Sequence, residues 1–334
     1  MMQEMITVAV DAMGGDNAPN EIIKGCIESI NDDSNIKIYL VGNNIIINEQ
    51  LTKYTYNKEQ LEVVDAKETI DTCESPVMAI RRKKESSLVK GLNLVKEKKA
   101  NAFVSAGSTG AILAGGTFIV GRIKGIERPA LAPLIPHKKG VSLLIDCGAN
   151  VDSKASYLVQ YAKMGSIYFE NVLGVKNPRV ALINIGEEKS KGNSLVKEAY
   201  SLLENEDINF IGNIEAREIP EGKADILVCD AFVGNIILKY TEGFALTMLS
   251  MLKKHLLQNV RSKIGTLLLK PALKDFKKSF DYSEYGGAPL LGLEGLVVKT
   301  HGSSDSKAIK NTILQCKKFS DQKINQKIKE NIKI

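Results

Sequence analysis

The hydrophobic positions of this chain fall into short continuous runs, and polar or glycine-containing turns follow them. Longer stretches with apolar residues at helical spacing separate the runs. Eight runs have the composition of buried strands: VAVDA, IKIYLVG, LEVVDA, AFVSAG, VSLLID, RVALINIG, INFIGN and ADILVCD. Strands that alternate with amphipathic helices are typical of βαβ units, in which helices cover both faces of a mostly parallel sheet. The pattern therefore predicts an α/β fold.

We expect residues 1–334 to form a single α/β unit, because no repeat and no linker rich in Pro, Gly or Ser divides the chain. A chain of 334 residues, 44% of them hydrophobic, can bury a large core. Residues 243–280 differ from the rest, since apolar residues at helical spacing are interspersed there with lysines. We predict that this segment forms a projecting, basic and amphipathic helical hairpin with a break around Gly265 and Pro271.

The first predicted strand ends in the loop MGGDN. Asp11 closes the strand, Gly14 and Gly15 allow a tight turn, and Asp16 or Asn17 can cap the following helix. A well-capped turn would by itself explain these residues. However, ligands of parallel sheets bind at the carboxyl ends of strands, so the loop is also a candidate for substrate binding.

The segment SAGSTGA repeats this character at the end of another strand. Gly107 and Gly110 free the backbone, while Ser105, Ser108 and Thr109 offer hydroxyl groups at the start of a helix. Free N–H groups and the positive end of a helix dipole favour an anion. The segment is neither a Walker A loop nor a GxGxxG motif, but it predicts a phosphate cradle.

Polar residues also follow the later strands. The segment THGSSD has a glycine turn and a serine, Ser303 or Ser304, that can cap the next helix. His301 is one of three histidines in the chain, and a lone histidine is more often structural than catalytic. The further candidates at strand ends are Asn150, Asn184, Lys191, Asn213, Asp230, Asn235 and Gly302.

Most of the net charge of +6 is explained by the hairpin segment, where eight Lys or Arg face one acidic residue between Met248 and Phe280. Few aromatic side chains accompany these charges, so we do not expect nucleic acid as a partner. No apolar run is long enough to span a bilayer and no secretory signal is present, which predicts a cytoplasmic protein. The five cysteines occur singly, and the histidines are far apart, so we expect neither disulfides nor a metal site.

Nine segments, in this order and spacing, resemble the PlsX family of phosphate acyltransferases: VAVDAMGGDNAP, SAGSTGA, IERPALA, LLIDCGANVDS, PRVALINIGEE, FIGNIEAREI, ILVCDAFVGNIILK, DYSEYGGAPLLGL and KTHGSSD. The resemblance covers nearly the whole chain. It implies a Rossmann-like three-layer α/β/α fold, similar to the isocitrate dehydrogenase and phosphotransacetylase group. Three positions depart from the family pattern, since Ser108 replaces an asparagine, and Ala216 and Ala231 replace glycines. The two alanines indicate that a Cβ is tolerated there.

The resemblance also implies an activity, in which a long-chain acyl group passes from acyl carrier protein to inorganic phosphate for phospholipid synthesis. It implies a homodimer without a cofactor, attached peripherally to the inner face of the cell membrane. Phosphate is already a nucleophile at neutral pH and a thiolate leaves readily, so positioned donors and positive charge matter more than an acid or base. We predict Lys191, His301, Asn184 and Asn235 as catalytic residues. The remaining candidates would bind substrate: Asp11, Gly14, Gly15, Asp16, Asn17, Ser105, Gly107, Ser108, Thr109, Gly110, Asn150, Asn213, Asp230, Gly302, Ser303 and Ser304.

The leucine-rich hairpin has two interpretations. Its apolar residues can pack on the sheet or across a dimer interface, or they can dip into a membrane while lysines meet anionic headgroups. We favour the second, because leucines crowd the predicted turn between basic residues. The same charges can attract acyl carrier protein, which is acidic. The predicted membrane contacts are Leu256, Leu257, Val260, Ile264, Leu267 and Leu268.

Three other functions stay open. A phosphotransacetylase would use a short acyl-CoA, a nicotinamide dehydrogenase would use the same fold, and a membrane-surface scaffold would have no chemistry. The density of glycines and amides at strand ends speaks against a scaffold. A covalent acyl-cysteine route through Cys147 or Cys229 is only a minor alternative. An adjacent carboxylate raises the pKa of a thiol, so less of the nucleophilic thiolate would be present.

Overall fold

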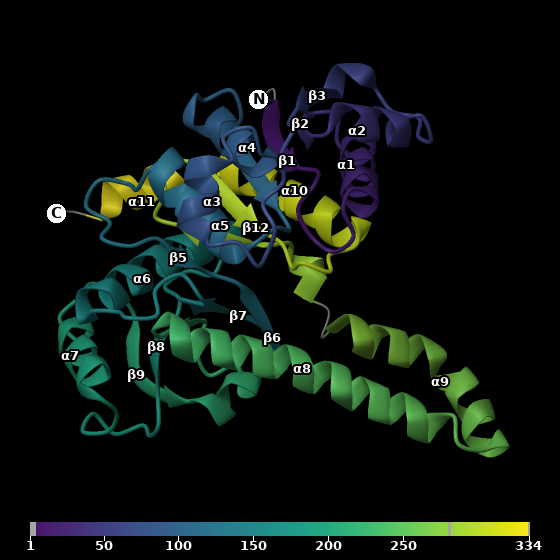
Figure 1. The fold of residues 1–334 in the computed structure, drawn as a ribbon. Helices are drawn as coiled ribbons and strands as arrows, with labels where there is room; N and C mark the ends of the chain where they lie inside the picture. The colour runs from purple at the N-terminus through teal and green to yellow at the C-terminus, as the bar shows by residue number, and fades with distance from the viewer. Residues whose placement is uncertain (1–4, 280–281, 333–334) are drawn as a thin grey trace.

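The computed structural model describes residues 5–279 and 282–332, which form two lobes and a projecting pair of helices (Figure 1). The first lobe is built on a seven-stranded sheet in the order β3-β2-β1-β4-β12-β11-β5, and the second on a five-stranded sheet in the order β6-β7-β10-β8-β9. The strands of the first lobe are β1 (Ile6–Asp11), β2 (Ile36–Gly42), β3 (Leu61–Asp65), β4 (Ala102–Ser105), β5 (Ala130–Leu131), β11 (Ala288–Leu291) and β12 (Leu296–Lys299). Those of the second are β6 (Leu134–His137), β7 (Gly140–Ile145), β8 (Val180–Asn184), β9 (Phe210–Glu215) and β10 (Ile226–Val228).

The predicted α/β fold is confirmed. All eight apolar runs contain strands, and β1, β2, β3, β4, β7, β8, β9 and β10 pair in parallel with their neighbours as buried runs should. The sequence prediction missed β5, β6, β11 and β12, which are two to four residues long. All four take part in the three antiparallel pairs among the named strands, which are β11 with β12, β11 with β5, and β6 with β7.

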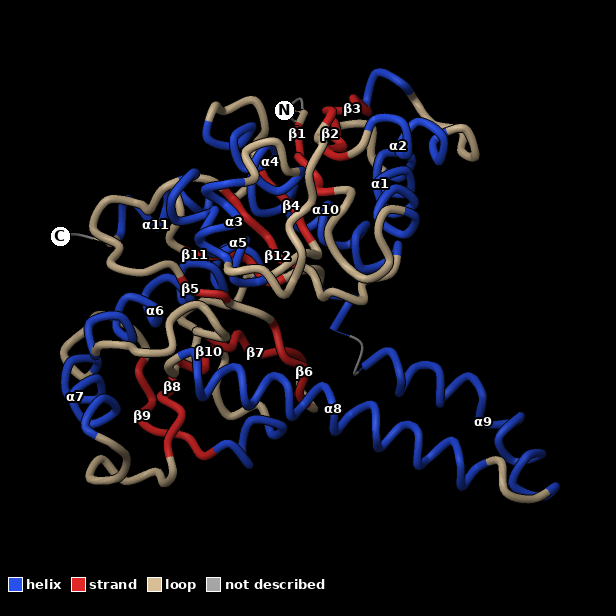
Figure 2. Tube along the Cα trace, in the orientation of Figure 1, coloured by secondary structure: helices blue, strands red, loops and turns tan. Residues whose placement is uncertain are grey.

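Helices cover both faces of the sheets (Figure 2). Alternate residues of one strand therefore enter different cores: Val8 and Val10 join one apolar cluster, and Ala9 joins the other. Both clusters contain residues of both lobes. The helices are α1 (Asn20–Asp32), α2 (Asn44–Leu51), α3 (Pro76–Arg82), α4 (Ser87–Lys96), α5 (Thr109–Gly115), α6 (Ala155–Tyr168), α7 (Ser194–Leu203), α8 (Ala231–Leu256), α9 (Val260–Ser279), α10 (Ser306–Asp321) and α11 (Ile324–Asn331).

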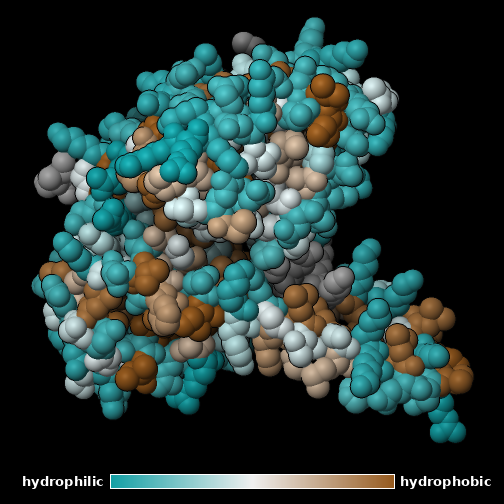
Figure 3. Space-filling view, in the orientation of Figure 1, coloured by the Kyte–Doolittle hydropathy of each residue, from teal (hydrophilic) through white to brown (hydrophobic). Residues whose placement is uncertain are grey.

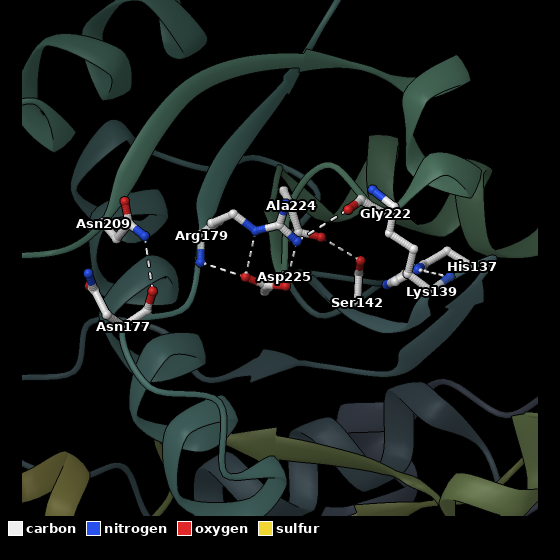
Figure 4. A network of polar contacts seen from close by, with 9 residues as sticks. All are labelled: His137, Lys139, Ser142, Asn177, Arg179, Asn209, Gly222, Ala224 and Asp225. Carbon is white, nitrogen blue, oxygen red and sulfur yellow. Dashed lines mark hydrogen bonds and ion pairs between the residues drawn. The ribbon is translucent and has the colours of Figure 1, made fainter.

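A polar network holds the second lobe together at the amino ends of β8 and β10 (Figure 4). The Arg179 guanidinium donates to both carboxylate oxygens of Asp225, at 3.0 and 2.9 Å, and the Arg179 N–H donates to the same group at 2.8 Å. Burial alone would raise the pKa of Asp225, but these hydrogen bonds outweigh it and hold that pKa below its usual value. The network lies at the end of the sheet opposite to the strand-end loops, so its role is structural.

Helices α8 and α9 form the predicted hairpin, which projects away from both lobes (Figures 1 and 2). The predicted break around Gly265 and Pro271 is wrong, because α9 continues through both residues. The turn comes earlier, where the Asn259 side chain accepts a hydrogen bond from the Ser262 N–H at 2.9 Å and so caps α9. Phe280, the last residue of the predicted hairpin segment 243–280, lies outside the described residues.

Candidate active site

The loops that follow β1, β4 and β12 pack against one another at one edge of the first lobe. Ser105 Oγ donates to Asp11 Oδ2 at 2.7 Å, and the Asp16 N–H donates to the Gly302 carbonyl at 2.8 Å. A Cβ on Gly14 would lie 2.9 Å from the Gly107 nitrogen, and a Cβ on Gly15, where φ is +102°, would lie 2.7 Å from Ala106 Cβ. Both glycines of the MGGDN loop are therefore required by the close approach of the neighbouring loops.

Long-range contacts also correct the predicted helix caps. The Asn17 amide donates to the carbonyls of Ser303 and Ser304, at 3.0 and 3.2 Å, instead of capping α1. The N-cap of α1 is a proline without a capping hydrogen bond, so neither Asn17 nor Asp16 caps that helix. The N-cap of α10 is Asp305, which accepts from the Ala308 N–H, so the prediction of a serine cap there was also wrong.

The proposed phosphate cradle is partly occupied by the protein itself. The Ser105 hydroxyl, which donates to Asp11, accepts from the Gly107 N–H at 3.0 Å. Ser108 caps α5 by accepting from the Ala111 N–H at 3.4 Å. The N–H groups of Thr109 and Gly110 lie in the first turn of α5, where a helix supplies no carbonyl partner. The donors available to an anion are therefore fewer than predicted.

Asn150 supports a buried carboxylate in the second lobe. Its side-chain amide donates to Asp146 Oδ2 at 2.9 Å, to the Pro129 carbonyl at 2.7 Å and to the Tyr161 hydroxyl at 2.9 Å. Burial raises the pKa of Asp146 to about 6, although the hydrogen bonds that it accepts from Asn150 oppose the shift. With so many protein partners, Asn150 holds the loop after β7 in place.

Three predicted residues gather around the loop 185–192 of the second lobe. The Asn184 amide donates to the Lys191 carbonyl at 3.2 Å, and the Asn213 amide donates to the Glu188 carbonyl at 3.1 Å. The Lys191 side chain is exposed. Asp230, a further candidate, caps α8 by accepting from the Val233 N–H at 2.9 Å.

A cleft of about 960 Å³ lies between the two lobes and the hairpin helices. Its walls are mostly apolar and include Leu131, Leu134, Leu249, Leu252 and Phe276. Of the predicted site residues, the cleft is lined by Thr109, Asn235, His301 and Ser304. Lys191 and Asn184 are not among the described residues that line it. The predicted catalytic group is thus divided between two places.

Lys299, Thr300 and His301, which follow one another at the end of β12, line one part of the cleft, which we call its polar end. His301 Nδ1 accepts from the Ser303 N–H at 3.3 Å, so a neutral ring carries its proton on Nε2, 3.9 Å from the Glu242 carboxylate. Burial lowers the pKa of His301, although Glu242 opposes the shift. The lowered pKa favours a neutral His301 ring, which can donate a hydrogen bond through Nε2 but supplies no positive charge.

Lys299 is the residue that the sequence prediction missed. Its Nζ donates to the Thr300 carbonyl at 2.5 Å. Burial lowers the pKa of Lys299 to about 8, and repulsion from Lys239 acts in the same direction. Its position directly before the THGSSD segment could have indicated a role in the site, but its strand is too short to be recognised from the sequence.

The two candidate cysteine nucleophiles are buried at strand ends. Burial raises the pKa of both Cys147 and Cys229 well above the usual value, and neighbouring carboxylates add to the shift. Since the thiolate is the nucleophile, the covalent route is disfavoured. Among the described residues, no group of three or more His, Cys, Asp or Glu is arranged to hold a metal ion.

An apolar cleft with a cationic, donor-rich end is the kind of site in which an enzyme joins an apolar substrate to an anion. Comparisons with known proteins give the same class. Residues 6–327 match the family described as "Fatty acid synthesis protein". The phosphate acyltransferases of Clostridium novyi and Clostridium acetobutylicum are 57% and 56% identical over 325 residues, with 97% of this chain and 98% of each relative covered.

The chain is therefore an enzyme of the acyltransferase class. It belongs to the PlsX family of phosphate acyltransferases, which confirms the resemblance. Solved structures share its fold at low identity. A phosphotransacetylase from Streptococcus pyogenes has a TM-score of 0.63 at 17% identity, covering 95% of this chain and 94% of its own. The EutD phosphotransacetylase from Staphylococcus aureus has a TM-score of 0.60 at 16% identity, with 95% of both chains covered.

Proposed function

We propose that the protein transfers a long-chain fatty acyl group from acyl carrier protein to inorganic phosphate. The observation that carries the proposal is the cleft of about 960 Å³, whose lining is mostly apolar and also includes Lys299 and His301. Each buried methylene of an acyl chain contributes about 0.8 kcal/mol to binding. An acetyl group would leave most of this wall unused, so its extent favours a long chain over a short one.

The chemistry requires little proton transfer by the protein. An oxygen of hydrogen phosphate attacks the thioester carbonyl carbon, the new C–O bond forms, and the C–S bond breaks. The leaving thiolate takes up the proton of the phosphate, and the products are an acyl phosphate and the free thiol of the carrier. We propose that His301 Nε2–H and the Asn235 amide donate to the oxyanion of the tetrahedral intermediate, because both residues line the cleft.

The test is to incubate the protein with inorganic phosphate and either palmitoyl-acyl carrier protein or acetyl-CoA, and to trap acyl phosphate with hydroxylamine. Hydroxamate from the carrier-bound long chain alone is expected. Hydroxamate from acetyl-CoA alone would make the protein a phosphotransacetylase. Product from neither donor, with vesicle binding intact, would favour a scaffold.

The hairpin is proposed to attach the protein to the inner face of the cell membrane. Apolar side chains gather at its tip (Figure 3). Of the six predicted membrane contacts, Leu256 is half-buried and the other five are exposed: Leu257, Val260, Ile264, Leu267 and Leu268. No helix in the described ranges is long and apolar enough to cross a membrane, so the contact would be peripheral. The lysines of the hairpin would meet anionic headgroups or the acidic carrier protein.

Replacing Leu268 by glutamate is expected to weaken binding to vesicles of phosphatidylglycerol about tenfold, because the leucine is 78% exposed at the tip and would be buried in lipid. Sedimentation with vesicles measures the effect. Ile45→Glu is the matched control, because Ile45 is 80% exposed on α2, far along the chain from the hairpin. Equal binding of the two variants would contradict the proposed contact.

A homodimer is proposed to form along an exposed apolar stripe of α8, of which Tyr240 and Phe244 also border the cleft. Phe232, Ile236, Tyr240 and Phe244 recur at every fourth residue, and each is more than half exposed. The rings of Tyr240 and Phe244 stack at 5.8 Å between centroids. Such a stripe on one helix fits a second copy of the chain. Ile236→Glu is expected to convert the dimer to a monomer, as measured by light scattering, and a dimer that persists would argue against this face.

A further inference from the structure

Lys299 is a half-buried cation without a carboxylate partner among the described residues. Among the described residues its hydrogen bond goes to a neutral carbonyl, that of Thr300, while the carboxylates of Glu242 and Asp16 act on its charge only through space. A buried ammonium group without an anion is costly, and most such groups in proteins are paired. The position of Lys299 at the polar end of the cleft therefore calls for an anionic ligand.

Thr300 gives a second, independent indication. Its side chain lines the same cleft and is only 4% exposed, yet Oγ1 has no hydrogen-bond partner in the described part of the chain. A buried hydroxyl group without a partner is rare and lowers stability. Because the residue borders the cleft, rotation of its side chain would bring the hydroxyl group to a ligand oxygen bound there.

The surrounding groups favour a small oxyanion. Thr109, at the amino end of α5, and His301 line the same cleft and can donate hydrogen bonds. Lys239 adds a positive charge, although it is paired with Glu242 at 2.7 Å. The carboxylates of Glu242 and Asp16 also act on the charge of Lys299.

We propose that Lys299 and Thr300 bind the phosphate that accepts the acyl group. This inference rests on the proposed function and places the acceptor beside β12, where Thr109 is the one member of the predicted cradle that shares the cleft lining. The phosphate at this site has two possible sources, free inorganic phosphate or the phosphodiester of the carrier's pantetheine arm. We commit to free phosphate, and the experiment separates the two.

Thr300→Val is the sharpest test, because valine has nearly the same shape and the hydroxyl that it removes makes no contact in the described structure. Its fold should therefore be unchanged. Binding of inorganic phosphate, measured by titration calorimetry without any acyl donor, is expected to weaken about tenfold. Lys299→Met should weaken it at least as much. Lys176→Met, at an exposed lysine outside the cleft, is the charge control and should bind phosphate as the wild type does.

Steady-state kinetics then separate the two phosphate sources. A raised KM for phosphate, with an unchanged KM for palmitoyl-acyl carrier protein, supports the proposal. A raised KM for the carrier alone, or no change in either variant, overturns it. If the variants bind phosphate more weakly but the wild-type protein makes no acyl phosphate, the result would support the site and reject the proposed function.

The pH dependence provides an additional readout. The charged form of Lys299 binds the anion, and its pKa of about 8 lies below the usual lysine value. Phosphate affinity of the wild type should therefore decline as pH rises through about 8, where inorganic phosphate is already a dianion. The decline should be absent in Lys299→Met. A decline of equal size in that variant would mean that another group titrates near pH 8, and it would overturn the role of Lys299.

Discussion

Replacing Gly234 by alanine is expected to destabilise the protein by about 3 kcal/mol, near the upper end of the usual cost of overpacking. Gly234 lies in the buried start of α8, and a Cβ there would lie 1.9 Å from the Asp146 carbonyl oxygen and 3.0 Å from its carbon. These are backbone atoms in the loop after β7, so a side-chain rotation cannot relieve the contact. Helix α8 must move away from the sheet, and the cleft wall that it forms must move with it.

Gly243→Ala on the same helix is the matched control. Gly243 is exposed, and an added Cβ would have nothing within 4 Å. Alanine should therefore stabilise the helix by about 0.5–1 kcal/mol through its higher helix propensity. Denaturant unfolding of both variants measures the difference. Equal stabilities would mean that the start of α8 is packed less closely against β7 than the structure indicates.

The strand-end loops illustrate how far sequence analysis reaches. The runs of apolar residues were sufficient to predict eight strands, because burial of both faces leaves a clear pattern along the chain. The polar character of the loops was also predictable. What the loops contact was not, because Asn17 and Ser303 are brought together only by the pairing of strands distant in sequence. The predicted cap of α1 failed for this reason, whereas the predicted serine cap of α10 failed because the neighbouring Asp305 caps that helix.

The missed residues have a related cause. Lys299 belongs to a strand of four residues between a glycine-rich segment and a turn, and its importance comes from burial at the end of the cleft. The hairpin turn was misplaced because Gly265 and Pro271 disfavour helices more than any other residues do. The capping side chain of Asn259 determines where α9 begins. Gly265 and Pro271 both lie within this exposed helix.

Replacing Leu249 by aspartate is expected to reduce the transfer of a palmitoyl group about a hundredfold. Leu249 lines the apolar wall of the cleft on α8, and the variant loses its contact with the acyl chain and places a carboxylate against that chain. The loss of about 1.5–3 kcal/mol from the apolar contact and the cost of desolvating the charge add together. The KM for phosphate should stay unchanged, because the polar end of the cleft is untouched.

The dependence on chain length makes this prediction specific. Donors with progressively shorter acyl chains should lose progressively less activity in Leu249→Asp, because fewer methylenes reach the altered wall. Ser250→Asp adds the same charge one residue further along α8, at an exposed position outside the cleft lining, and controls for effects on the helix. A loss that is the same for every chain length would mean that the wall does not hold the acyl chain. The enzyme would then recognise its donor through the thioester and the carrier, and the apolar cleft would need another occupant.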